Sequence, residues 1–255
     1  MLWQDDSVTR SDRHQYLIRL GYDGSRFFGV PPQKEQPTVA LALRERLEKA
    51  AGQRARALCF TARTDRGVHA VENYATCWFI DPLDAKQFES AIAIDRDDGL
   101  HRVEAFPVDI HVHARNVSAG KWYRYRIRTD GKADDRALHI EGSLNWELMQ
   151  QMANCFQGTH DFSAYRYRCS SPNTVKTLSR VELVEVEGLI DIHFEGDGFL
   201  RWMIRKLVGT IVAVGQGVFT MDEAVKLLES GKSYGAPRAV DACGLTLMAI
   251  RRRSD

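Results

Sequence analysis

The chain lacks several features that would assign it to a particular class of protein. Its five cysteines are odd in number and form no C-x-x-C pair, so a disulfide framework is not indicated and reduced thiols are expected. The longest apolar run, Leu207 to Val214, is far shorter than the roughly 20 residues needed to cross a bilayer. No basic segment followed by an apolar run stands near Met1, so no signal peptide is expected. These absences predict a cytoplasmic protein that does not enter a membrane.

A surplus of charge of one sign is also absent, because 35 Lys and Arg residues stand against 34 Asp and Glu residues. The bulk charge therefore does not indicate a nucleic-acid-binding protein, although a local basic stripe can do so. Such a stripe runs from Lys121 to Arg128, where alternation would place Tyr123 and Tyr125 on one strand face and the arginines on the other. Two further basic clusters comprise Arg166 and Arg168, and Arg201, Arg205 and Lys206.

Strand and helix patterns alternate along the chain, with no short repeat and no low-complexity linker. The clearest helix spans 38–51, with Thr38 as its N-cap and Gly52 after its last turn. Further helices are predicted over 82–93, 145–157, 199–214 and 221–229. Strands are predicted over 16–21, 57–60, 74–80, 102–106, 123–127, 181–186, 189–194 and 245–250. An apolar content of 44% suffices for a sizeable core.

This order of elements predicts an α+β fold made of two ferredoxin-like, split β-α-β halves. The halves would share an extended, mostly antiparallel sheet with helices on one face. We place the division at residues 1–115 and 116–255, so that the first half holds the loop around Asp65 and the second holds Tyr123 and Arg205.

The segment Ala62-Arg63-Thr64-Asp65-Arg66-Gly67-Val68-His69-Ala70 stands between two predicted strands. Alternate residues of an extended chain project to the same side, so Arg63 and Asp65 would face one space. A carboxylate held ionised among cations suits a nucleophile or base that acts on a polyanion. An ordinary turn is the alternative, because Asp and Gly both favour turns for local reasons.

The same segment resembles the Gly-Arg-Thr-Asp-x-Gly-Val-His signature of the TruA-type tRNA pseudouridine synthases, with Ala62 in place of the first glycine. Four more segments resemble motifs of that family, in the family's order: 21–29, 113–125, 158–166 and 199–209. Gly244-Leu245-Thr246-Leu247 is similar to its C-terminal Gly-Leu-x-Leu. The resemblance thus extends from about residue 16 to residue 250.

The resemblance implies a role for each matched site residue. Asp65 would be the catalytic nucleophile, and Arg63 would enter the RNA and help to expel the target base. Tyr123 would pack on the uracil, Arg205 would pair with the Asp65 carboxylate, and Leu245 would line the uracil pocket. A cation within about 4–6 Å favours the ionised form of a carboxylate.

The implied reaction is the isomerisation of uridine to pseudouridine in tRNA, in the region of the anticodon stem-loop. The carboxylate could attack C1′, attack C6 of uracil, or remove a proton from C2′. Neither a metal nor a redox or nucleotide cofactor is required, since no electrons or phosphates are exchanged. The resemblance also implies a homodimer that tRNA crosses.

Two departures from the family affect the RNA-docking surface. The family's Gly-Trp-Gln is replaced by Gly29-Val30-Pro31-Pro32-Gln33, and the asparagine of its Leu-Asn-x-x-Leu-Pro is replaced by Ala93. One alternative function is therefore an RNA-binding module of the same fold without turnover. A second is a metal-dependent hydrolase, in which His111 and His113 on a strand would present two imidazoles on one face.

Overall fold

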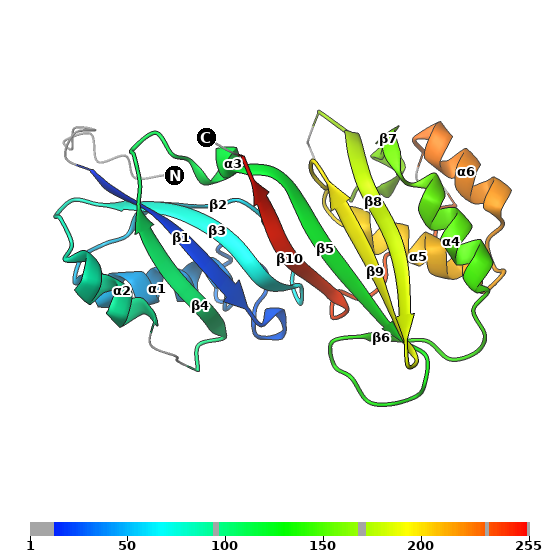
Figure 1. The fold of residues 1–255 in the computed structure, drawn as a ribbon, viewed down its shortest axis with the longest axis horizontal. Coiled ribbons are helices and arrows are strands. Elements are labelled where there is room, and N and C mark those ends of the chain that lie inside the picture. The colour runs from blue at the N-terminus through cyan, green and yellow to red at the C-terminus, as the bar shows by residue number, and fades with distance from the viewer. Residues whose placement is uncertain (1–12, 94–96, 168–171, 233–234, 254–255) are drawn as a thin grey trace. The chain divides into compact units, whose positions relative to one another are not determined.

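The computed structural model describes residues 13–93, 97–167, 172–232 and 235–253. The chain divides into two compact units, which are described separately below (Figure 1). Unit 1 comprises Met1–Ala119 and Arg252–Asp255, and unit 2 comprises Gly120–Arg251. Among the described residues, no helix has the length and apolarity that a bilayer span requires.

Unit 1 is built on an antiparallel sheet in the order β4-β1-β3, with β2 paired to β3. Its elements are β1 (His14–Tyr22), the 3₁₀ turn η2 (Gly24–Arg26), α1 (Val39–Ala51), β2 (Arg56–Phe60), β3 (His69–Phe79), α2 (Ala85–Ala93), β4 (Leu100–Pro107) and α3 (Ala114–Val117). The core lies between the sheet and the longer helices, where Tyr16 of β1, Phe79 of β3 and Phe88 of α2 meet edge to face.

The first helix forms where the sequence predicts it, because its ends are fixed locally. The Thr38 side chain accepts a hydrogen bond from the Leu41 N–H, and Gly52 takes the left-handed conformation with a φ of 66°. Buried Arg46 then ties α1 to the start of β4. Its guanidinium binds the Asp98 carboxylate and donates to the Leu100 carbonyl at 3.3 Å.

Unit 2 has the strand order β10-β5-β9-β8-β7, and short β6 pairs with β5 in parallel. Its elements are β5 (Ser118–Arg128), β6 (Leu138–His139), α4 (Trp146–Cys155), β7 (Gly158–Asp161), the 3₁₀ turn η3 (Ser163–Tyr165), β8 (Val175–Val186), β9 (Leu189–Gly196), α5 (Met203–Gly215), α6 (Met221–Ser230) and β10 (Leu245–Arg252). The pairings of β5 with β9, β9 with β8 and β8 with β7 are antiparallel. The predicted α+β class with mostly antiparallel strands is therefore confirmed.

The hairpin predicted across Glu187 and Gly188 is confirmed, since Val186 faces Leu189 in the register of β8 and β9. The alternation predicted for β5 is confirmed as well. Tyr123 and Tyr125 are buried toward the core, whereas Trp122 and Arg124, on the other face, are only half-buried.

Two predicted helices begin later than the sequence pattern suggested. Helix α2 starts at Ala85 rather than at residue 82, because the Gln53 side chain binds both the N–H and the carbonyl of Asp81. Asp84 takes the capping position instead and accepts from the Gln87 N–H at 2.9 Å. Helix α5 starts at Met203 rather than at residue 199, because Trp202 takes a left-handed conformation with a φ of 64°.

The four cysteines in the described part of the chain are free thiols, and Cys169 lies outside it. Cys77 is buried on β3, and desolvation raises the pKa of its thiol to about 12. This thiol stays protonated at neutral pH and is therefore a poor nucleophile.

Candidate active site

The loop that carries Asp65 connects β2 to β3 in unit 1. Ala62 and Thr64 are buried, whereas Arg63 is exposed and Asp65 is half-buried. This alternation is what an extended segment produces when successive side chains face opposite sides. Arg63 and Asp65 thus lie on the more open side of the loop.

Asn73 of β3 clamps the beginning of this loop. The main-chain pairing of β2 with β3 ends where the Thr61 N–H donates to the Tyr74 carbonyl at 2.8 Å. One residue further on, the Asn73 carboxamide replaces a strand partner. Its Oδ1 accepts from the Ala62 N–H at 3.2 Å, and its Nδ2 donates to the Ala62 carbonyl at 2.9 Å. Asn73 is fully buried, so both of these bonds are shielded from water.

A buried hydroxyl pair holds the next turn of the loop. The Tyr22 hydroxyl accepts from Asn73 Nδ2 at 3.3 Å and lies 2.9 Å from Thr64 Oγ1. Because the phenol has one proton, donation to Thr64 satisfies it while it accepts from Asn73. Burial raises the pKa of Tyr22 to about 12, so the hydroxyl keeps that proton at neutral pH.

The far side of the loop rests on the segment that follows β1. The Val30 N–H donates to the Thr64 carbonyl at 3.1 Å, and the Val68 N–H closes a turn onto the Asp65 carbonyl at 3.2 Å. Glycine is required where these segments touch. A Cβ on Gly24 would lie 2.1 Å from the Val68 carbonyl oxygen. The main chain around Asp65 is therefore fixed from two sides.

In unit 2, Tyr123 lies on the core face of β5, and its ring meets that of Phe199 edge to face at 5.2 Å. Leu245, the first residue of β10, is also buried. The segment before Leu245 is held against β5, because the Tyr125 hydroxyl donates to the Asp241 carbonyl at 2.7 Å. Tyr123 and Leu245 thus lie on two elements that are bound to each other.

Arg205, in the first turn of α5, is held by the same segment. Its Nε donates to the Val240 carbonyl at 2.7 Å, and its guanidinium lies over the Trp202 ring at 4.9 Å. Trp202 in turn stacks on Tyr167, with ring centroids 3.7 Å apart and an interplanar angle of 9°. The left-handed backbone of Trp202 is unusual for a bulky residue, and such strain concentrates at functional sites.

The structure places Asp65 and Arg63 together on one loop of unit 1. It places Tyr123, Arg205 and Leu245 in unit 2, around β5, the start of α5 and the segment before β10. Sequence reasoning overlooked Asn73 and the Trp202–Tyr167 stack. Asn73 could have been found, because it shares a strand face with Ala75 and Cys77, and an amide at a core-facing position requires partners.

The basic stripe on β5 is less available to phosphates than the sequence suggested. Arg126 binds the Asp191 carboxylate with two bonds of 2.8 Å, and Arg128 binds Asp130 and Asp134. Lys206, from the cluster that includes Arg201 and Arg205, donates to the carbonyls of Ala164 and Arg166. Arg168, from the remaining cluster, lies outside the described residues. Arg126, Arg128 and Lys206 therefore serve the fold of unit 2.

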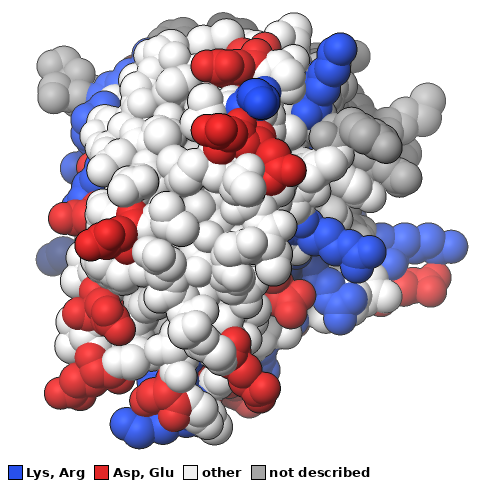
Figure 2. Space-filling view, turned by 90° about the vertical axis from the view of Figure 1, so that its right-hand side faces the viewer, with Lys and Arg blue, Asp and Glu red and all other residues white. Residues whose placement is uncertain are grey.

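The face of the molecule shown in Figure 2 carries several acidic side chains and no broad positive surface. It is the side on which α4 and α6 lie in Figure 1. The exposed carboxylates of these helices are Glu147, Asp222, Glu223 and Glu229. This face is electrostatically unsuited to a phosphate backbone.

The prediction that His111 and His113 lie on a strand is wrong. Both belong to the link between β4 and α3, and His113 caps α3 by accepting the Arg115 N–H at 3.2 Å. Within the ranges that the structure describes, no three His, Cys, Asp or Glu side chains form a group that could hold a metal ion.

Comparison with known proteins identifies similar chains. A family model described as "tRNA pseudouridine synthase" matches residues 152–251. The tRNA pseudouridine synthase A of Acetivibrio thermocellus is 34% identical over 236 residues, which cover 91% of this chain and 96% of that protein. Those of Geotalea daltonii and Thermosipho melanesiensis are 32% and 31% identical, over 91% and 92% of this chain and 96% and 98% of the relatives.

Proposed function

Because the chain belongs to the tRNA pseudouridine synthase A family, we propose that Asp65 is the catalytic carboxylate of an enzyme that converts uridine to pseudouridine in tRNA. In this isomerisation the bond from C1′ to N1 breaks, the uracil turns, and a bond from C1′ to C5 forms. C5 loses a proton and N1 gains one, so no external oxidant or group donor is needed. The observation that carries the assignment is the loop of Asp65, whose main chain is clamped by Asn73 and by the segment after β1.

The other predicted site residues have the roles that the family resemblance implies, and their chemistry is compatible with those roles. Arg63, exposed beside Asp65, occupies the space that the target nucleotide leaves when it unstacks, a step that costs a few kcal/mol. Tyr123 supplies a planar surface for the uracil, and Leu245 an apolar one. Arg205 balances the charge of the Asp65 carboxylate. The Trp202 ring and the Val240 carbonyl order its guanidinium within unit 2.

The test of function is the release of tritium from tRNA that carries [5-³H]uridine, since isomerisation removes the hydrogen on C5. The purified chain should release tritium without added metal or cofactor. Binding of the tRNA without release would instead favour the RNA-binding module that lacks turnover. Mapping pseudouridine in the product tests whether the target lies in the anticodon stem-loop, and light scattering tests the homodimer. The cytoplasmic location stays a prediction.

We expect Tyr123→Phe to keep most of the activity and Tyr123→Ala to lose it. The ring is what meets the base, and stacking contributes roughly 1–3 kcal/mol per base, which corresponds to about a 5- to 150-fold effect on kcat/KM. The tritium assay at subsaturating tRNA measures this effect. Similar losses in both variants would contradict stacking and assign the role to the hydroxyl group.

We expect Trp202→Ala to lower kcat about 3- to 10-fold, because a cation–π contact of about 0.5–2 kcal/mol that orders Arg205 is removed. Trp202→Phe keeps an aromatic face and should recover most of kcat. Because a purely structural role would appear in stability alone, thermal unfolding is measured alongside kcat. A loss of stability without a change in kcat would refute the positioning role.

A further inference from the structure

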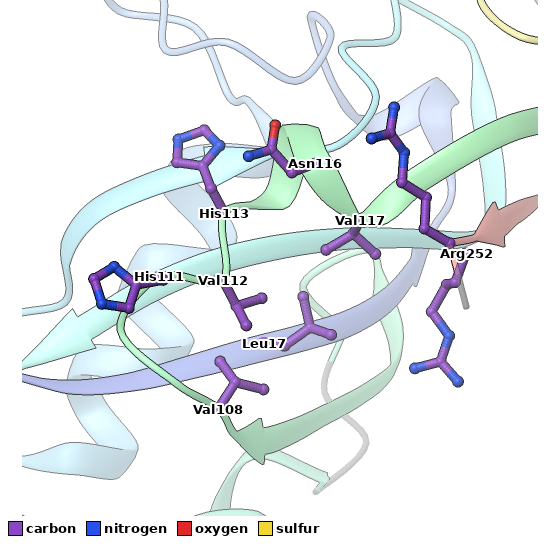
Figure 3. Close-up of a pocket in the computed structure, with 9 residues that line it drawn as sticks. Leu17, Val108, His111, Val112, His113, Asn116, Val117 and Arg252 are labelled. Carbon is purple, nitrogen blue, oxygen red and sulfur yellow. The ribbon is translucent and has the colours of Figure 1, made fainter. Parts of the chain in front are cut away.

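A cavity of about 570 Å³ opens on unit 1, and none of the residues that line it belongs to the loop of Asp65 (Figure 3). Its volume falls within the range of roughly 300–1,000 Å³ that is usual for ligand sites. Leu17 of β1 contributes to the floor, and its neighbour Tyr16 packs on Phe88 of α2 on the opposite face. Since successive strand residues alternate, the cavity lies on the face of the sheet turned away from α2.

One wall of the cavity is held in place by hydrogen bonds. It consists of the link from β4 through α3, which is bound to the sheet at three points. Gln15 donates to the Val112 carbonyl, the Ala114 N–H donates to Thr76 Oγ1 at 3.3 Å, and Thr61 donates to the Ala114 carbonyl at 2.7 Å. These bonds hold the link in place without a ligand.

The C-terminal segment forms the opposite wall. The Arg253 N–H donates to the Val117 carbonyl at 2.9 Å, and Arg253 Nε lies 3.3 Å from the Ser118 carbonyl. The guanidinium of Arg252 approaches the Tyr74 ring at 5.9 Å. Two arginines are thereby brought to the rim of a cavity whose other wall lies more than 130 residues earlier in the chain.

The lining combines an apolar floor with a rim of hydrogen-bond donors. Leu17, Val108, Val112 and Val117 lie together, with His111 and His113 on one side and Arg252 on the other (Figure 3). His113 Nδ1 accepts the Arg115 N–H, so the neutral ring carries its proton on Nε2 and acts there as a donor.

No carboxylate is among the described residues that line the cavity. The nearest in sequence, Asp109, accepts the His111 N–H at 2.8 Å. The cavity therefore suits a ligand with a flat, apolar body, several acceptor oxygens and negative charge.

We infer that this cavity binds one nucleoside phosphate unit, with its phosphate at Arg252 and Arg253 and its base on the apolar floor. The unit is either an unpaired nucleotide of the tRNA substrate or a free nucleotide. The first of these sources rests on the proposed function. Arginines that bind a phosphate, beside a planar imidazole ring and an apolar surface that meet a base, are a combination suited to a single unpaired nucleotide.

The first arm of the test is a titration with uridine 5′-monophosphate. Its readout is the NMR chemical shifts of the imidazole rings of His111 and His113. Wild type should show saturable shifts, and the double variant Arg252→Gln/Arg253→Gln should weaken binding at least tenfold. The matched control is Lys49→Gln/Arg54→Gln, which removes the same charge at two exposed positions of unit 1 outside the cavity. The control should bind like wild type.

The second arm measures tRNA affinity as a function of salt. If the cavity holds a nucleotide of tRNA, Arg252→Gln/Arg253→Gln should lower affinity about tenfold at 0.1 M salt and reduce the salt slope by about 0.7, the value for one lost phosphate contact of a single strand. Val112→Trp fills the floor, so it should lower affinity and leave the slope unchanged. If the double variant loses binding of uridine 5′-monophosphate but keeps the tRNA affinity of wild type, the site is assigned to a free nucleotide.

The inference is overturned if the pocket variants match the Lys49/Arg54 control in both arms. It is also overturned if Arg252→Gln/Arg253→Gln or Val112→Trp changes the oligomeric mass measured by light scattering, because a second copy of the chain would then cover the cavity. Pseudouridine formation by wild type is measured separately. If wild type makes pseudouridine while the pocket variants behave as the control does, only the inference fails, and if wild type makes none, the proposed function fails.

Discussion

Asp65→Asn should abolish pseudouridine formation, with less than a few per cent of wild-type turnover remaining. The amide has nearly the shape of the carboxylate but is neither a nucleophile nor a base of useful strength. The main chain around position 65 is held through Ala62, Thr64 and Val68, so the variant should fold and keep its affinity for tRNA. Tritium release measures turnover, and filter retention measures binding.

The matched control for this variant is Asp81→Asn. Asp81 is exposed after β3, and its main chain is held by Gln53. The control should retain wild-type turnover. Turnover above a few per cent in Asp65→Asn, with the control normal, would count against Asp65 as the catalytic carboxylate.

Asn73→Leu should lower the free energy of unfolding by about 3–5 kcal/mol. Leucine has a similar volume but leaves the Ala62 N–H and carbonyl without their buried partner, and an unsatisfied buried group costs about 1–3 kcal/mol. Urea unfolding measures the loss. The same change at Asn154, exposed on α4, should cost less than about 0.5 kcal/mol.

The Asn73 variant should also lose activity at temperatures where it remains folded. The loop of Asp65 would no longer be fixed at its beginning, so kcat should fall about 10- to 100-fold, because small displacements of a reacting group are costly. A destabilised Asn73→Leu protein with wild-type kcat would show that the clamp supports the fold and not the site.

The sequence predicted those elements whose ends are decided by neighbouring residues. Helix α1 is one, since Thr38 and Gly52 cap it within one turn of each end. The β8–β9 hairpin is another, since its strands are joined by two residues. The start of α5 was not predictable in this way, because the conformation of Trp202 accompanies a stack on Tyr167, 35 positions earlier.

The candidate site divides along the same line. The residues around Asp65 left an ordinary turn and a catalytic loop both open, and the resemblance supplied the role of Asp65 as well as those of the other site residues. The hold on the loop was not predicted, because a side chain from the next strand performs it. The role of the β5 arginines was not predicted either. Arg126 pairs with Asp191 on the neighbouring strand, so its guanidinium is not available to a phosphate.

The Asn73 carboxamide binds the main-chain N–H and carbonyl of position 62, which every amino acid except proline supplies. Mutational drift at that position is thereby uncoupled from the placement of Asp65. The alanine at position 62 accordingly leaves both of these bonds intact. We therefore expect position 62 to accept small residues, because its side chain is buried, whereas position 73 should require asparagine.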